Sequence, residues 1–179
     1  TQVDLESRDD GGRTPLLTAA WNGHLPVVQC LCEQGGDKEA RDRRGMSPLL
    51  TAAQSGHLPV MQYLCEQGAD KEARSNGDRT PLHLAAYEGH FPVVQYLCKQ
   101  GADKEARDGT DRTPLHWAAV KDHLPVVQYL CKQGAYKEAR DTYGRTPLNW
   151  AAQEGHLPVV QELCKQGADR HTRDKLGKV

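Results

Sequence analysis

The heptapeptide Gly-His-Leu-Pro-Val-Val-Gln occupies residues 23–29 and returns, with small changes, four more times along the chain. Each copy begins 33 residues after the one before it, and a triplet Thr/Ser-Pro-Leu, first seen at residues 14–16, repeats at the same interval. Self-similarity at a fixed period of this length is typical of stacked repeats rather than of a single globular core. The later copies of the heptapeptide begin at Gly56, Gly89, Asp122 and Gly155.

The period accounts for the whole chain of 179 residues, and no linker or low-complexity tract interrupts it. We therefore expect a single repeat domain over residues 1–179. The five repeats lie at approximately residues 9–41, 42–74, 75–107, 108–140 and 141–173, with partial repeats at 1–8 and 174–179.

Each repeat carries the signals of two short helices. Thr14 is a favourable N-cap, and Pro15 suits the first helical position because the missing N–H of proline costs nothing there. Gly23 is a typical left-handed residue after a helix, and Pro26 then opens a second helix that Gly35 ends. Helices of about eight to ten residues are marginal alone in water, so stacking must supply the stability. The sequence therefore predicts an all-α solenoid of helix-turn-helix repeats joined by β-turn or hairpin loops.

The third repeat contains the segments TPLHLAA at residues 80–86, GH at 89–90 and GAD at 101–103. This pattern resembles the ankyrin repeat, a 33-residue unit of a β-turn, two antiparallel helices and a return loop. The resemblance extends over essentially the whole chain. It implies a non-catalytic scaffold whose turn tips and first helices line a concave groove that binds a partner protein or peptide.

Differences among the five copies gather in the turn and at the end of the first helix, the two regions that the resemblance assigns to the groove. Exposed tips also tolerate drift. Drift alone would have loosened the columns of Gln29 and Lys38 as well, so we favour a binding groove, although a recent duplication would weaken this comparison. The candidate partner-binding residues are Trp21, Asn22, Arg43, Arg44, Met46, Gln54, Arg79, Tyr87, Glu88, Arg112, Val120, Lys121, Tyr143, Arg145 and Gln153.

Large side chains are the expected anchors of such a groove. Trp21 and Tyr87 occupy the variable helix position and are predicted to contribute most to binding. Trp117 and Trp150 lie one residue before the Ala pair, where we expect packing. The arginines before the Thr/Ser-Pro step form a series that either binds an acidic peptide or pairs with nearby aspartates, and both readings stay open. This series consists of Arg13, Arg79, Arg112 and Arg145, with Met46 interrupting it.

The cysteines point to packing rather than chemistry. Five of the six recur every 33 residues, from Cys32 to Cys164, and so are predicted to form one core column. Packed helices lie about 8–10 Å apart, whereas a disulfide needs Cα atoms within about 7 Å. No C-x-x-C occurs, so neither a zinc site nor any other metal or cofactor is expected. Unpaired thiols fit a reducing compartment, the cytoplasm or nucleus.

The histidines also fall into columns. The resemblance implies that His24 and its equivalents tie neighbouring turns together by hydrogen bonds. His83 and His116 occupy the second recurrent histidine position, where Asn149 and leucines stand in other repeats and are expected to lose a local hydrogen bond. No Ser/His/Asp constellation and no phosphate-binding loop follows from this pattern, so we expect no enzyme activity.

Three aspartates replace glycines of the repeat. Asp122 stands at the hinge between the two helices, where a left-handed residue is needed and aspartate is tolerated at a cost. Asp78 and Asp111 replace the turn glycine, so we expect those turns to be reshaped. The recurrent tail Asp-Lys-Glu-Ala-Arg is predicted to form a surface ladder of alternating charge that serves solvation and register.

Composition excludes several function classes. The chain has 23 Lys+Arg against 24 Asp+Glu, which argues against a basic nucleic-acid-binding domain. The mean hydropathy is −0.73, no apolar run approaches about 18 residues, and no signal peptide is visible. We expect a monomer that binds a protein or peptide, without nucleic acid or membrane insertion. The alternative is a structural spacer, or near-consensus repeat segment, of a longer multidomain protein with no ligand of its own.

Overall fold

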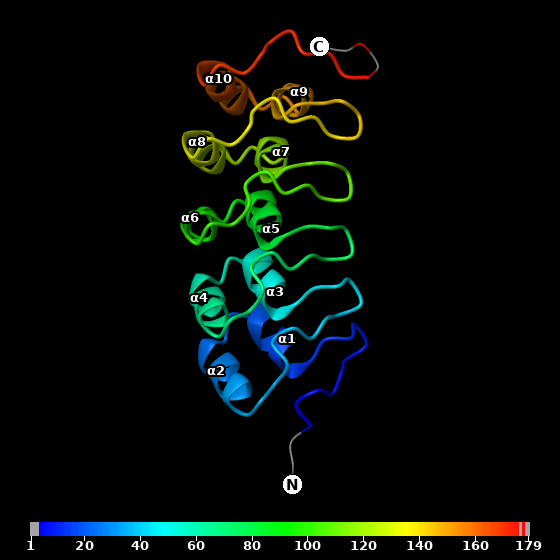
Figure 1. Ribbon diagram of the computed structural model, residues 1–179, viewed down its shortest axis with the longest axis vertical. Coiled ribbons are helices and arrows are strands. Elements are labelled where there is room, and N and C mark those ends of the chain that lie inside the picture. The colour runs from blue at the N-terminus through cyan, green and yellow to red at the C-terminus, as the bar shows by residue number, and fades with distance from the viewer. Residues whose placement is uncertain (1–3, 176, 178–179) are drawn as a thin grey trace. The chain divides into compact units, whose positions relative to one another are not determined.

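The computed structural model describes residues 4–175 and 177 of the chain. Within these residues there are ten α-helices and no β-strand, so the predicted all-α class is confirmed (Figure 1). The first helices of the repeats are α1 (Pro15–Trp21), α3 (Pro48–Ser55), α5 (Pro81–Glu88), α7 (Pro114–Val120) and α9 (Pro147–Gln153). The second helices are α2 (Leu25–Glu33), α4 (Leu58–Glu66), α6 (Phe91–Lys99), α8 (Leu124–Lys132) and α10 (Leu157–Lys165).

The chain divides into two compact units, Thr1–Pro81 and Leu82–Val179, which we call unit 1 and unit 2. In unit 1, α1 packs against α2 and α3, and α3 packs against α4. In unit 2, α7 packs against α8 and α9, and α10 packs against α8 and α9. Within each unit the helix pairs are therefore stacked as the sequence predicts, and the turns lie on the side of the first helices away from the second helices (Figure 1).

Local capping explains where the first helices begin and end. The Thr14 hydroxyl accepts the backbone N–H of Leu17 at 3.3 Å, and Ser47 does the same for Leu50 in the next repeat. Helix α3 ends at Gly56, whose φ of 77° is left-handed. The helices contain only seven to nine residues, which is too short for stability without the neighbouring repeat.

The core is formed by small and branched apolar side chains. Ala52 and Ala53 of α3 are completely buried, and such small side chains allow α1 and α3 to approach closely. In the second helices, Leu64 and Leu130 are also 0 % exposed. This continuous burial between repeats supplies the apolar area that a single helix pair lacks.

The recurrent Glu and Arg of the tail form hydrogen bonds between repeats instead of the predicted charge ladder. Glu39 Oε1 accepts the backbone N–H of Asp70 at 3.1 Å, and Glu105 Oε1 accepts that of Tyr136 at 2.8 Å. Arg107 Nη1 donates to the carbonyl of Arg140 at 2.6 Å. Lys38 Nζ likewise donates to the carbonyl of Gln67 at the end of α4. The predicted role in register agrees with these bonds between repeats, whereas the side chains bind backbone groups of the next repeat and not one another.

The histidines at the helix hinge join repeats in the predicted way. His57 Nε2 lies 2.9 Å from the carbonyl oxygen of Trp21, and His123 Nε2 lies 2.9 Å from that of Tyr87. Both carbonyls belong to the last residues of first helices, which lack intrahelical partners. Within each unit, these histidines therefore hold the end of a first helix against the next repeat, where candidate site residues lie.

Candidate functional site

The turns of four repeats are held by an aspartate near their start, whereas Ser75 stands at this position in the third repeat. Asp42 Oδ1 accepts the backbone N–H groups of Arg44 at 2.8 Å and of Met46 at 2.9 Å. Gly45 follows with φ of 73°, a conformation that glycine adopts without strain. The backbone N–H of Arg43 donates to the carbonyl of the preceding turn at 3.1 Å. The turn backbone is thus fixed by hydrogen bonds, while the side chains at its tip remain exposed.

The turns that contain aspartate in place of glycine keep the same shape. Asp78 and Asp111 have φ values of 55° and 58°, in the left-handed region that Gly45 also occupies. Arg74 Nη1 donates to the Asp78 carbonyl at 3.1 Å, as Arg107 does to that of Asp111 at 2.7 Å. The expected reshaping of these turns was therefore wrong, and their tip positions are equivalent to those of the other repeats.

The predicted site residues differ in exposure according to their position. Tip residues and residues just past the first helices are exposed, whereas those at the base of the turn are partly or fully covered. Exposed are Asn22, Arg43, Arg44, Glu88, Lys121, Tyr143 and Gln153; half-buried are Trp21, Gln54, Arg79, Tyr87, Arg112, Val120 and Arg145; buried is Met46. At 4 % exposure Met46 has no surface to offer a partner, and we leave it out of the site.

In unit 1 the structure brings Trp21 and Arg44 together. The guanidinium carbon of Arg44 lies 5.7 Å from the centroid of the Trp21 ring. Its Nε lies 3.5 Å from Asp42 Oδ2, yet the Arg44 side chain remains 58 % exposed. Arg43 is exposed beside it at the tip. One indole and two guanidinium groups therefore share one surface of unit 1.

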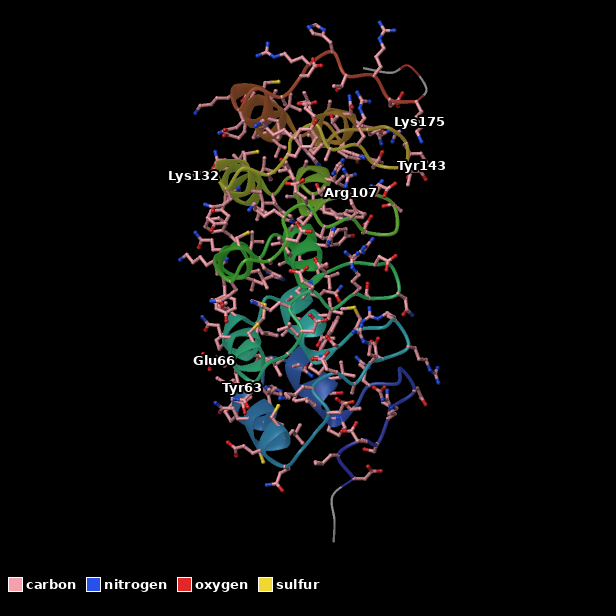
Figure 2. All side chains as sticks on the ribbon, in the orientation of Figure 1. Tyr63, Glu66, Arg107, Lys132, Tyr143 and Lys175 are labelled. Atoms are coloured by element: carbon pink, nitrogen blue, oxygen red, sulfur yellow. The ribbon has the colours of Figure 1, made fainter. Side chains whose placement is uncertain are left out.

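In unit 2 a second aromatic and cationic pair lies at the end of the first helices. Tyr87 meets Trp117 edge to face, with ring centroids 5.2 Å apart. Lys121 Nζ lies 4.6 Å from the centroid of the Tyr87 ring, on the side open to solvent. Tyr143 lies at a turn tip, 55 % exposed, with the guanidinium of Arg145 5.6 Å from its ring (Figure 2).

Arg112 and Arg145 are largely packing residues. The guanidinium carbon of Arg112 lies 4.5 Å from the ring centroid of Trp117 and 4.2 Å from that of Trp150, so the group is sandwiched between two indoles. Its side chain is only 12 % exposed, with Nε 3.5 Å from Asp141 Oδ2. Arg145 continues the stack 4.7 Å from Trp150. Of the two readings of this arginine series, pairing with aspartates therefore describes Arg112 and Arg145 better.

The indole N–H groups complete this stack. Trp117 Nε1 donates to Asp108 Oδ2, and Trp150 Nε1 donates to Asp141 Oδ2, both at 2.8 Å. Burial alone would raise the pKa of Asp108, but hydrogen bonds from Thr110, Trp117 and Arg112 outweigh it and hold the pKa below its ordinary value. Both tryptophans are buried, at 7 % and 9 % exposure, which agrees with the predicted packing role.

The second histidine position keeps its local hydrogen bond in the repeat that has asparagine there. His116 Nδ1 accepts the backbone N–H of Thr113 at 3.1 Å, and its Nε2 lies 3.1 Å from the Arg145 carbonyl. Asn149 reproduces the first contact, since its Oδ1 accepts the N–H of Thr146, but its Nδ2 donates to a different partner, the carbonyl of Thr172. The expectation that asparagine would lose the local hydrogen bond was wrong, because its amide oxygen accepts the same backbone N–H as the histidine nitrogen.

The cysteines are free thiols, as predicted, but they do not form a buried core column. Only Cys131 of the recurrent series is buried, and burial raises its pKa to about 11; Cys30 is exposed.

Within residues 4–175 and 177, no group of three His, Cys, Asp or Glu side chains is placed to hold a metal ion. A hollow of about 360 Å³ between α6 and α8 is lined by Phe91, Tyr129, glutamines, proline and lysine, without a carboxylate or histidine.

A family model described as ankyrin repeats, in three copies, matches residues 1–75, 37–108 and 105–174. These matches span nearly the whole chain, and the chain belongs to the ankyrin repeat family. Ankyrin repeats are generally protein–protein interaction modules, and proteins built from them are generally non-catalytic scaffolds. A search of the curated proteins found no match. In the part of the chain that the structure describes, no helix has the length and hydropathy needed to cross a membrane.

Proposed function

We propose that this chain is a non-catalytic scaffold that binds a partner protein or peptide through its turn tips and first-helix ends, the surface that corresponds to the groove of ankyrin repeats. The observation that carries the proposal is the pairing of rings with exposed cations there, Trp21 with Arg44 and Tyr87 with Lys121. Aromatic and arginine side chains are the types most enriched among residues that dominate binding energy.

The variable positions of the repeats give further support to the same surface. Lys38 itself donates to the carbonyl of Gln67 at the end of α4, a structural role that makes the constancy of its column a poor measure of drift. The variable positions carry small polar residues in several repeats, as exposed tips do, but some present large aromatic or cationic side chains of the kind that dominate interfaces. These are Trp21, Arg43, Arg44, Tyr87, Lys121 and Tyr143. We place this scaffold in the cytoplasm or nucleus, a proposal that the six free thiols support.

The test is an affinity capture from host lysate with the chain and with Trp21→Ala/Tyr87→Ala. Tyr136→Ala/Leu157→Ala is the matched control, because it removes two large exposed side chains outside this surface. A protein that both the chain and the control retain, and that the first variant loses, would support the proposal. Equal retention by all three would place the interface elsewhere, and no specific capture would favour the structural-spacer function.

A further inference from the structure

We propose that the surface of unit 1 around Trp21, Arg43 and Arg44 binds a short acidic segment of the partner protein. Its carboxylates pair with the two guanidinium groups, and an apolar side chain packs on the Trp21 ring. The inference rests on the proposed function and names the chemistry of the partner at one part of that surface.

Charge is distributed unequally among the turn segments. The turn segments 8–13, 41–46 and 74–79 of unit 1 contain seven arginines and four aspartates. The segments 107–112 and 140–145 of unit 2 contain four arginines and three aspartates. Among these five segments the excess of arginine over aspartate is largest in 41–46, the turn that contains Arg43 and Arg44.

The guanidinium groups also differ in how accessible they are to a ligand. In unit 2 the Arg112 side chain is only 12 % exposed between two indoles, and it approaches a buried aspartate. In unit 1 the Arg44 side chain is 58 % exposed, and Asp42 already uses its other oxygen for two backbone N–H groups. Among the residues that the structure describes, the exposed Arg43 side chain forms no ion pair. These two groups therefore retain N–H donors for a carboxylate, which guanidinium binds in a bidentate manner.

The two first helices of unit 1, α1 and α3, also favour an acidic ligand. Neither α1 nor α3 contains a charged residue, so no carboxylate on them repels an incoming anion. In unit 2 the corresponding helix ends carry mixed charges, including Glu88 and Glu154. Trp21 is half-buried, which leaves part of its indole open beside Arg44. A cationic rim around an aromatic ring fits a segment that mixes carboxylates with one apolar side chain.

Two neighbouring aspartates limit the size of the ligand. Asp10 and Asp78 are exposed on the turns on either side of the Arg43–Arg44 tip. A long polyanion such as nucleic acid would meet both of them, and the whole chain has a net charge of −1. A short peptide can place its carboxylates on one turn alone. We therefore assign the surface to an acidic protein segment.

The test is selection of a displayed library of random dodecapeptides on the immobilised full chain, followed by fluorescence anisotropy with the enriched peptides. We expect the enriched pool to be richer in Asp and Glu than the input library. We also expect Arg43→Glu/Arg44→Glu to weaken binding by about tenfold or more, since it replaces attraction by repulsion at two positions. Lys132→Glu/Lys165→Glu is the matched control: it makes the same change in charge on α8 and α10, and Lys132 lies on the opposite side of unit 2 from Tyr143 (Figure 2).

The other possible results distinguish a failure of this inference from a failure of the proposed function. Enriched peptides that are neutral or basic, and that Trp21→Ala/Tyr87→Ala fails to bind, would overturn the acidic ligand and leave the proposed function standing. Equal weakening by the two charge-reversal variants would show a general charge effect and overturn the inference. Tighter binding of a labelled single-stranded oligonucleotide, lost in Arg43→Glu/Arg44→Glu, would assign the surface to nucleic acid. No enrichment at all would overturn both proposals.

Discussion

At the scale of single residues, His116 links the packing of a first helix to pH. The side chain is completely buried, and this burial lowers its pKa from 6.5 to about 4. Between these pH values the unfolded chain binds a proton that the folded chain does not. Stability from this group is therefore fully present above pH 6.5 and is lost as the pH falls toward 4. The loss from His116 is at most about 3 kcal/mol.

We expect His116→Asn to reduce this acid sensitivity and to keep the local hydrogen bond at the start of α7, because Asn149 accepts the equivalent N–H of Thr146 in the next repeat. The measurement is the free energy of unfolding by urea at neutral pH and near pH 4.5, for the chain and the variant. The drop between the two pH values should be smaller in the variant. An equal drop in both proteins would show that other groups, not His116, cause the acid sensitivity.

At the scale of structural elements, the connection between repeats depends on side chains that bind backbone groups. Glu105 Oε1 accepts the N–H of Tyr136 at 2.8 Å, across one repeat. Removing the acceptor in Glu105→Ala should cost about 1 kcal/mol of unfolding free energy, since the amide loses its partner. Glu105→Gln keeps an amide oxygen at that position and should cost clearly less. Urea unfolding of both variants provides the measurement.

The control for this prediction is Glu66→Ala, which removes an exposed carboxylate at the end of α4 (Figure 2). Its effect should be close to zero. If Glu105→Gln destabilised the chain as strongly as Glu105→Ala, the negative charge rather than the hydrogen bond would be the source of stability. If all three variants were equivalent, the column of glutamates would make no measurable contribution to holding the repeats together.

At the scale of the whole molecule, the helices were predictable because their signals are local. Thr14, Pro15 and Gly23 mark the ends of helices within a few residues. Equivalent residues recur every 33 residues in the other repeats, with few exceptions. The state of Arg112 was not predictable in the same way, because it depends on Trp150 in the following repeat. The role of Glu105 was missed although its strict recurrence was visible, because an exposed-looking charge does not reveal a backbone partner.

The cooperativity of unfolding also belongs to the whole molecule. The boundary between unit 1 and unit 2 falls within α5, after its first residue Pro81. A helix of eight residues cannot keep its first turn when the rest unfolds. The repeats are also nearly identical, which gives them similar intrinsic stabilities. We therefore propose that the chain behaves as one domain and unfolds in a single transition.

The measurement is hydrogen exchange of backbone amides, followed by mass spectrometry across a urea titration, which reports on both units in one unmodified protein. Amides of α3 in unit 1 and of α9 in unit 2 should lose protection at the same urea concentration. Separate midpoints for the two helices would show two independent folding units and contradict a single domain over residues 1–179. Coincident midpoints would mean that a change at the Trp21 surface alters the stability of the entire stack, so binding variants must be compared at matched stability.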